Sequence, residues 1–372
     1  MNESVRLGEC ATFINGYAFK PTNWSKNGIP IIRIQNLTGS MNQLNYYNGK
    51  LDSKYIINNG DILISWSASL GVFEWKNGKA YLNQHIFKVE FNKKDINKKY
   101  FVYLIKSKIN EMKKNTHGST MKHITKSDFD KIEIFLPNIQ KQQEISNKLD
   151  KVQEIIDLRK KQIKELNELI KSMFVNMFEN EKYPKKTLSE LTDKITDGSH
   201  NPPTGIVENE GYMMLSSQNI INNSINYDNV RYLKKEDFEK ENRRTDLQKG
   251  DVLLTIVGTV GRTAIITEES NLVLQRSVAV IKPNKEINSV YLVGALNSES
   301  VINQLNKGAK GVAQKGIYLN DLKKIIIKVP PIELQNQFAD MVKQINKQKF
   351  FIEKSLKETE DLQESLMNKY FN

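Results

Sequence analysis

The feature that most constrains this chain is an internal repeat. Segment 118–137 is matched in order and spacing by segment 311–330, about half a chain length away. The offset grows from 181 residues between Leu7 and Leu188 to 193 residues between Lys122 and Lys315, so the copies differ by loop insertions. Shorter landmarks recur in the same order, namely Leu7-x-Glu9 with Leu188-x-Glu190, Gln35-Asn36 with Gln218-Asn219, Gly60-Asp61-Ile62-Leu63 with Gly250-Asp251-Val252-Leu253, and Asp95-Ile96-Asn97 with Glu286-Ile287-Asn288. Self-similarity of this kind predicts two copies of one domain.

A length of 372 residues fits two hydrophobic cores with connecting segments. The repeat places the boundaries. We predict a first domain at 1–137, a helix and linker at 138–183, a second domain at 184–331 and a C-terminal helix at 332–372.

Both domains are predicted to be of the mixed α/β (α+β) class. Short apolar runs rich in β-branched residues lie between clusters of Asn, Gly and Ser, and such runs are typical of strands. They are 29–34, 61–65 and 85–91 in the first copy and 212–215, 251–257 and 277–281 in the second. Helical patches follow at 99–112 and 289–305.

After each domain, apolar residues recur at heptad spacing over about five repeats, which predicts a coiled coil. Arg159 interrupts the first seam, and Lys349 and Thr359 interrupt the second. The alternative is that each helix packs only on its own domain. At 1.5 Å per residue, a helix of about 38 residues would form a rod of about 57 Å. If each domain reads a short DNA segment, such a rod would fix the separation of the two segments.

Charge, cysteine content and the N-terminal sequence narrow the function classes. The net charge is +12, of which +9 falls in 1–137 and +3 in 184–331, so the excess favours a polyanionic partner. The alternative is a charge that serves only solubility. The single Cys10 excludes an intramolecular disulfide and a thiolate zinc cage. Because no signal peptide or apolar run of about 20 residues is found, a cytoplasmic location is predicted.

Two patterns resemble parts of catalytic sites, and each is incomplete. Asn201-Pro202-Pro203-Thr204 is similar to the motif with which adenine methyltransferases hold a flipped base, but Thr204 replaces the aromatic ring. Asp61 with Glu74-Trp75-Lys76 resembles a nuclease metal site, yet the second copy has no equivalent around 264–266, so Asp61 is better explained as a turn residue. The four histidines show no metal-ligand spacing.

The order of the repeated motifs resembles the DNA-specificity subunit of type I restriction-modification systems, over the whole chain. The motifs are the Leu-x-Glu openings, the two Gly-Asp-(Ile/Val)-Leu segments, and a closing block. In that block Ile124-x-x-x-Asp128-Phe129 pairs with Ile317-x-x-x-Asp321-Leu322, and Gln142-Gln143-Glu144 and Gln335-Asn336-Gln337 then open the helices. The second helix departs from the first in this opening, which leaves open whether both hold a partner equally well.

The resemblance implies two target-recognition domains separated by two antiparallel helices, each domain reading one half of a bipartite site in double-stranded DNA. It implies that the chain joins two methyltransferase subunits and, with them, motor-nuclease subunits. S-adenosylmethionine would then belong to the methyltransferase, and ATP and Mg to the motor-nuclease. The chain itself would bind no cofactor or metal and catalyse nothing.

Candidate recognition residues are those near the repeated landmarks whose side chains suit DNA. Arg and Lys read guanine, Asn and Gln read adenine, and small hydroxyl residues contact phosphates. The first domain offers Arg33, Gln35, Asn36, Ser65, Trp66, Gln84, His85, Lys122 and His123. The second domain offers Ser217, Gln218, Asn219, Thr255, Arg262, Gln275, Arg276, Lys310, Gln314 and Lys315.

Several of these residues have alternatives. The Gln-Asn pairs at 35–36 and 218–219 are equally typical of turn caps, and His123 of a solvated loop. The sequence alignment pairs His85 with Arg276 and His123 with Gly316, so the copies differ where they would read different bases. At the level of function, the alternatives are a coiled-coil protein-interaction adaptor without sequence-specific DNA binding and a self-sufficient enzyme.

Overall fold

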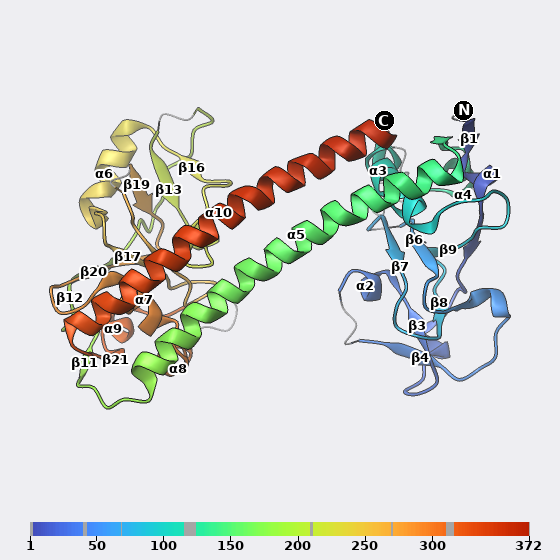
Figure 1. Cartoon of the computed structure of the whole chain (residues 1–372). Coiled ribbons are helices and arrows are strands. Elements are labelled where there is room, and N and C mark those ends of the chain that lie inside the picture. The colour runs from blue at the N-terminus through green and yellow to red at the C-terminus, as the bar shows by residue number, and fades with distance from the viewer. Residues whose placement is uncertain are drawn as a thin grey trace. The chain divides into compact units, whose positions relative to one another are not determined.

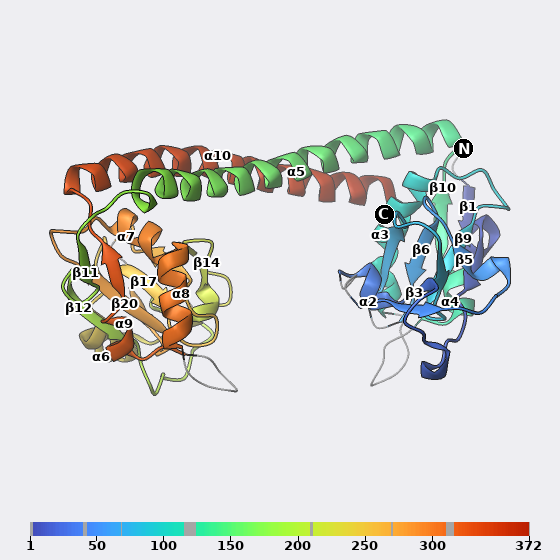
Figure 2. The same cartoon turned by 90° about the horizontal axis from the view of Figure 1, so that it is seen from below.

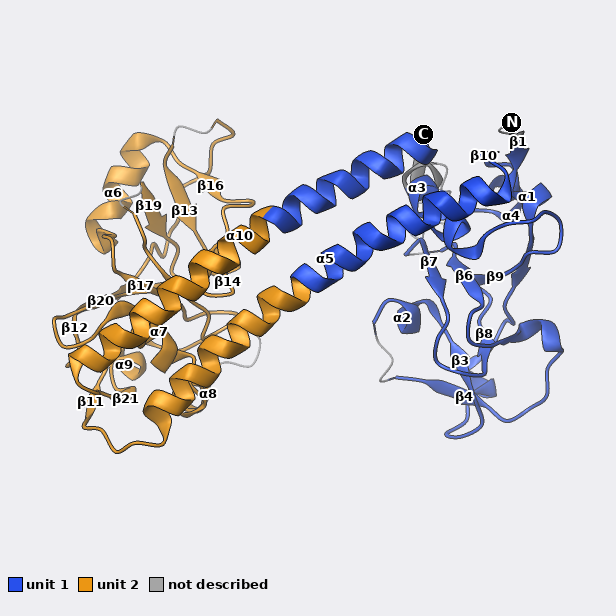
Figure 3. Cartoon of the chain, in the orientation of Figure 1, with its two compact units in different colours: residues 1–159, 355–372 blue, residues 160–354 orange. Residues whose placement is uncertain are grey.

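The computed structural model describes residues 3–39, 43–67, 69–114, 124–208, 211–268, 271–309 and 316–371, with the backbone alone at 110–114. The chain divides into two compact units. Unit 1 comprises Met1–Arg159 and Ser355–Asn372, and unit 2 comprises Lys160–Lys354 (Figures 1 and 3). Each unit therefore contains part of both long helices. No helix in the described ranges is long and apolar enough to cross a membrane.

Unit 1 is built on an antiparallel sheet in the order β2-β9-β6-β7. Its strands are β2 (Thr12–Asn15), β9 (Ile86–Glu90), β6 (Ile62–Ser65) and β7 (Gly71–Glu74). Every residue of β6 is buried, as expected for a central strand with both faces covered. Phe13 of β2 packs edge-on against Phe129 at 4.8 Å between ring centroids, and both belong to the main core with helix α3 (Lys98–Lys114).

A second sheet of unit 1 has the order β4-β3-β8-β5, and a third pairs β1 with β10. The β3 and β8 strands are parallel, with Ile31 opposite Tyr81. These strands are β4 (Asn45–Tyr47), β3 (Ile29–Ile32), β8 (Ala80–Leu82), β5 (Ile56–Ile57), β1 (Glu3–Arg6) and β10 (Glu133–Leu136). The short helices are α1 (Leu7–Cys10), α2 (Ile34–Leu37), α4 (Lys126–Asp130), η1 (Pro21–Asn23) and η2 (Ser53–Tyr55).

Unit 2 repeats this plan with sheets β12-β20-β17-β18, β16-β13-β19 and β11-β21, and adds the pair β14-β15. Its strands are β11 (Lys185–Thr187), β12 (Thr192–Asp197), β13 (Met213–Leu215), β14 (Ile220–Ile221), β15 (Ser224–Ile225), β16 (Arg231–Tyr232), β17 (Val252–Thr255), β18 (Thr263–Ile265), β19 (Leu272–Leu274), β20 (Val278–Pro283) and β21 (Ile326–Lys328). Its helices are η4 (Ser217–Asn219), α6 (Lys235–Thr245), α7 (Ser289–Leu296), α8 (Glu299–Gly308) and α9 (Leu319–Leu322).

Equivalent backbone hydrogen bonds correct one pairing expected from the sequence. Gln84 N donates to Tyr17 O at 3.0 Å, and Arg276 N donates to Ser199 O at 2.9 Å. Gln84 is therefore the counterpart of Arg276. Likewise Trp66 N donates to His85 O and Ile256 N to Ser277 O, so the alignment of His85 with Arg276 was wrong by one residue. The dipeptides Gln84-His85 and Gln275-Arg276 look alike but occupy positions that differ by one residue.

The two long helices are α5 (Ile139–Phe174), which continues into the π-helical turn η3 (Val175–Glu179), and α10 (Ile332–Phe371). Within unit 1, Gln363 donates to Gln153 at 2.9 Å, and the Arg159 guanidinium donates to Ser355 O and to the Thr359 hydroxyl. Since higher numbers on one helix meet lower numbers on the other, the helices are antiparallel, as Figures 1 and 2 also show. The predicted fold class is thus confirmed.

The start of each long helix packs on the domain that precedes it and the end packs on the other domain, so the alternative that each helix packs only on its own domain is wrong. In unit 1, Ile145 and Leu149 of α5 join the main core together with Phe371 of α10. In unit 2, Phe174 and Phe338 lie 5.6 Å apart between ring centroids within that unit's core.

A buried glutamine at the start of each long helix attaches it to a domain. Gln142 Oε1 accepts from Asn97 N at 2.9 Å, and Gln335 Oε1 accepts from Asn288 N at 2.8 Å. Each amide nitrogen donates to a proline carbonyl, at 2.8 Å for Gln142 and 2.9 Å for Gln335. The repeated Ile-Asn and Gln landmarks therefore form one structural joint in each unit.

Removal of this joint should weaken the protein locally. We expect Gln335→Ala to destabilise unit 2 by about 2 kcal/mol, because a buried backbone N–H and a carbonyl lose their partners. Gln337→Ala, at an exposed position on the same helix, should change stability by less than about 0.5 kcal/mol. Denaturant unfolding with hydrogen exchange read at Asn288 checks this. Equal effects of the two substitutions would contradict the assigned role.

Candidate nucleic-acid interface

Four of the residues predicted to bind DNA gather at one end of the sheets in unit 1. Arg33 follows β3, Trp66 follows β6, and Gln84 and His85 precede β9. The Trp66 and His85 ring centroids lie 5.3 Å apart, and Gln84 Nε2 lies 3.1 Å from His85 Nε2. The Arg33 guanidinium sits 5.4 Å from the ring centroid of Trp24, which is not among the residues selected from the sequence. This end of unit 1 therefore joins a cation, an imidazole, an amide and two indole rings.

The charge state of His85 follows from its surroundings. Burial, and secondarily the positive charge of Arg33, lower the pKa of the His85 imidazole below its usual value near 6.5. The ring is consequently neutral at pH 7, and its Nε2 can accept a hydrogen bond from the Gln84 amide. That contact orients Gln84 and turns its carbonyl oxygen away from His85.

Unit 2 gathers its equivalent residues in the same way. Ser217 N donates to Ser277 Oγ at 3.1 Å, which brings the turn after β13 beside the turn before β20. Gln275 is half-buried and Arg276 is exposed in that turn. Arg262, directly before β18, is exposed, and its Nη1 lies 3.5 Å from Ile220 O.

The predicted asparagines hold turns instead of facing outward. Asn36 and Asn219 are buried, and their Oδ1 atoms accept from Arg33 N and Ser216 N, each at 2.9 Å. The turn-cap alternative is confirmed for both. Their neighbours Gln35 and Gln218 are half-buried and exposed, respectively.

Ser65 and Thr255 occupy equivalent buried positions at the ends of β6 and β17. Their hydroxyls donate at 2.5 Å to Ser69 O and Thr259 O, respectively, in the turn that follows each strand. Recurrence of the same residue class in both copies was the signal for a structural role, because residues that read different bases need not match.

Five predicted residues lie outside the described residues, namely Lys122, His123, Lys310, Gln314 and Lys315. Their segments end at equivalent places. Ile124 N donates to Trp66 O at 3.1 Å, and Ile317 N donates to Ile256 O at 2.9 Å. The described chain that follows each segment therefore lies at the strand end where the other candidates gather.

Asp61, one of the acidic residues that resembled a nuclease site, holds a turn, and so does its counterpart Asp251. Asp61 Oδ2 accepts from Asn58 N at 2.8 Å, and Asp251 Oδ2 accepts from Gln248 N at 2.9 Å, which confirms Asp61 as a turn residue. Ile265 occupies the position of Glu74 in the second copy, opposite Val252. Among the described residues, no group of three His, Cys, Asp or Glu side chains is arranged to hold a metal ion.

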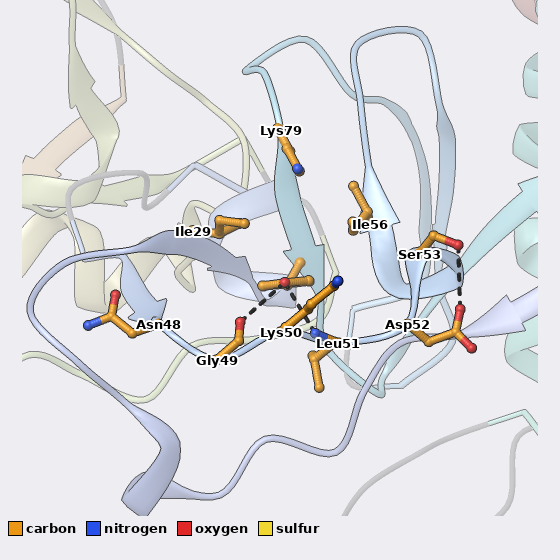
Figure 4. Close-up of a pocket in the computed structure, with 10 residues that line it drawn as sticks. Ile29, Asn48, Gly49, Lys50, Leu51, Asp52, Ser53, Ile56 and Lys79 are labelled. Atoms are coloured by element: carbon orange, nitrogen blue, oxygen red, sulfur yellow. Dashed lines mark hydrogen bonds between the residues drawn. The ribbon is translucent and has the colours of Figure 1, made fainter.

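A shallow hollow of about 630 Å³ lies on the second sheet of unit 1, away from the predicted set (Figure 4). Lys50 and Lys79 reach it from two different loops. The Tyr81 hydroxyl donates to Gly49 O at 3.3 Å and accepts from Leu51 N at 3.4 Å, which fixes the hollow's floor. None of the residues selected from the sequence lines it.

Comparison with known proteins decides the family. The model of the type I restriction modification DNA specificity domain matches residues 2–168 and 180–360. The chain belongs to this family. The predicted family and its DNA-specificity function are confirmed, and the two matched ranges correspond to the two copies of the repeat.

Relatives span most of the chain. The EcoBI specificity subunit of Escherichia coli is 26% identical over 99% of this chain and 85% of its own length. The MjaVIII specificity subunit of Methanocaldococcus jannaschii is 25% identical over 98% of this chain and 89% of its own.

Two solved structures share the fold. The type I restriction-modification S subunit from M. genitalium has a TM-score of 0.58 at 14% identity and covers 100% of this chain and 96% of its own. A structure from work on complex assembly and conformational transition of the type I system has a TM-score of 0.57 at 17% identity, covering 99% and 97%.

The neutral His85 gives a prediction for stability against pH. Because its pKa is lower in the folded than in the unfolded chain, the unfolded chain takes up this proton first as the pH falls. Unit 1 should therefore lose stability on acidification below about pH 6.5. Between pH 7.5 and 5.5, the melting temperature of the His85→Gln variant should therefore fall less than that of the wild type. An identical pH dependence in both proteins would contradict the buried neutral ring.

Proposed function

We propose that this chain is the non-catalytic specificity subunit of a type I restriction-modification complex, in which each recognition domain reads one half of a bipartite double-stranded DNA target. The observation that carries the proposal is one repeated backbone with different side chains at its loop end. Gln84 corresponds to Arg276, and His85 to Ser277. Two sites of the same architecture but different hydrogen-bonding groups suit two different short sequences.

In this proposal residues 1–137 and 184–331 are the reading domains, while 138–183 and 332–372 form the scaffold that holds two methyltransferase subunits and, through them, motor-nuclease subunits. The relatives named specificity subunits support this division of labour. S-adenosylmethionine is assigned to the methyltransferase, and ATP and Mg to the motor-nuclease. The complex would act on DNA in the cytoplasm.

The proposed DNA contacts are the candidates whose side chains are exposed or half-buried. In the described residues they are Arg33, Gln35, Trp66, Gln84, His85, Ser217, Gln218, Arg262, Gln275 and Arg276. To these we add Lys122, His123, Lys310, Gln314 and Lys315 from the neighbouring segments. The excess of +9 in the first domain supports attraction to phosphates.

Deletion of this chain tests the function directly. Genome-wide adenine methylation is compared between cells that carry the chain with its methyltransferase and cells that lack only this chain. We expect one split motif, with two short defined parts around an unspecified spacer, to disappear. An unchanged methylation pattern would reject the proposal and favour the protein-interaction adaptor.

Single substitutions separate base contacts from phosphate contacts. Arg276→Ala should weaken binding to the target DNA by about 1–3 kcal/mol, because a bidentate contact to guanine is lost. It should also relax specificity in one half of the target. Lys285→Ala removes the same charge at an exposed position after the opposite end of β20 and should leave the motif unchanged. Uniform weakening on all sequences would assign Arg276 to a phosphate instead. Methylome sequencing and competition binding with the assembled methyltransferase provide the measurement.

A further inference from the structure

An ordered side-chain cluster in unit 2 was not among the residues selected from the sequence. Asp197, the last residue of β12, has a side chain only 9% exposed, and its Oδ2 lies 2.8 Å from Nε2 of His200. Its Oδ1 forms an ion pair with Arg244 of α6, whose Nε also donates to Asp197 O at 2.8 Å. The His200 side chain is 58% exposed. A largely buried carboxylate therefore holds an imidazole that remains open to solvent.

The backbone places this imidazole beside the proposed DNA contacts. A Cβ atom on Gly198 would lie 2.0 Å from Leu274 O, so glycine is required where the chain crosses β19. The crossing is fixed by Ser199 N donating to Leu274 O at 2.7 Å, and by Arg276 N donating to Ser199 O at 2.9 Å. His200 thus follows directly on the residue that hydrogen-bonds to the backbone of Arg276.

The hydrogen bond to Asp197 determines what His200 can offer. A carboxylate only accepts, so the Nε2 atom of His200 carries the hydrogen. In the neutral ring Nδ1 is then an acceptor. In the major groove, acceptors pair with the exocyclic amino groups of cytosine and adenine. Because Asp197 already orients the ring, less conformational freedom is lost when it meets a base.

The first domain has the same crossing without the cluster. A Cβ atom on Gly16 would lie 2.2 Å from Asn83 O, and Gln84 N donates to Tyr17 O as Arg276 N does to Ser199 O. The position of Asp197 is held by Asn15 and that of His200 by Ala18. The crossing therefore belongs to the shared scaffold, while the held imidazole distinguishes the second domain.

We propose that His200 is a specificity-determining residue of the second recognition domain and accepts a hydrogen bond from a base amino group, with Asp197 and Arg244 as its positioning residues. This inference rests on the proposed function and names a contact within it. It adds one residue to the group around Arg276 and explains why a largely buried carboxylate lies at the end of β12.

The test uses the full chain assembled with its methyltransferase, and methylation motifs are read genome-wide. His200→Ala should reduce discrimination at one base pair by about tenfold, the equivalent of about 1.4 kcal/mol. That base pair should lie in the same half of the target that Arg276→Ala relaxes, and Arg33→Ala should affect the other half. Arg244→Ala should reproduce a weaker form of the His200→Ala effect.

Controls separate recognition from folding. Arg243→Ala removes the same charge from the neighbouring exposed position of α6 and should leave the motif unchanged. Thermal unfolding of His200→Ala should match the wild type, because the exposed ring contributes little to the core. A large loss of thermal stability would assign the cluster to folding and overturn the inference.

Each failure has its own signature. If the wild-type chain directs no split motif, the proposed function itself fails. If it does direct one, and His200→Ala leaves every position as selective as before, only the inference about His200 fails. Uniform weakening of all sequences by His200→Ala would also overturn it, because that result marks a phosphate contact.

Discussion

The fold depends on the buried amide joint between each domain and the long helix that follows it. Gln142 and Gln335 each satisfy a backbone N–H and a carbonyl that would otherwise be buried without partners. The next residue adds a second bond. Asn97 Nδ2 donates to Gln143 Oε1 at 2.6 Å, and Asn288 Nδ2 donates to Asn336 Oδ1 at 2.9 Å. Replacement of Gln143 by the shorter Asn336 in the second copy therefore preserves the joint.

Polar residues in the helix seam serve a different purpose. The Arg159 guanidinium donates hydrogen bonds to Ser355 O and to the Thr359 hydroxyl. Arg159 and Thr359, which both interrupt the heptad pattern, are therefore partners. Such a pair gives up apolar burial but disfavours other registers, because a shift would bury the guanidinium without acceptors. These polar contacts therefore set the register of the two helices within unit 1.

The repeat made the fold class, the paired helices and the turn role of Asp61 predictable, because each depends on residues that recur. The alignment of the two copies was wrong by one residue at His85, because Gln84-His85 and Gln275-Arg276 look alike but occupy shifted positions. It also could not separate Asn36 from Gln35, since only the three-dimensional turn decides which amide faces the backbone. Asp197 and His200 escaped notice because their counterparts Asn15 and Ala18 carry no related chemistry. Recurrence along the sequence therefore indicates scaffold residues well, but it cannot indicate residues whose chemistry differs between the two copies.

The two domains also differ in net charge, and under the proposed function this difference bears on recognition. The first domain carries an excess of +9, and the second only +3. Both domains contain ion pairs. The second pairs Arg244 with Asp197, and Lys282 with Asp251 at 2.6 Å. The first pairs Lys54 with Asp52 at 3.7 Å and Lys88 with Asp61 at 3.9 Å. Paired cations cannot release counterions from DNA as free ones do, so they add little to nonspecific attraction. Under the proposed function, the higher net charge makes the first domain the better source of salt-dependent affinity. Orientation of His200 by the largely buried Asp197 then gives the second domain a route to specificity that net charge does not measure.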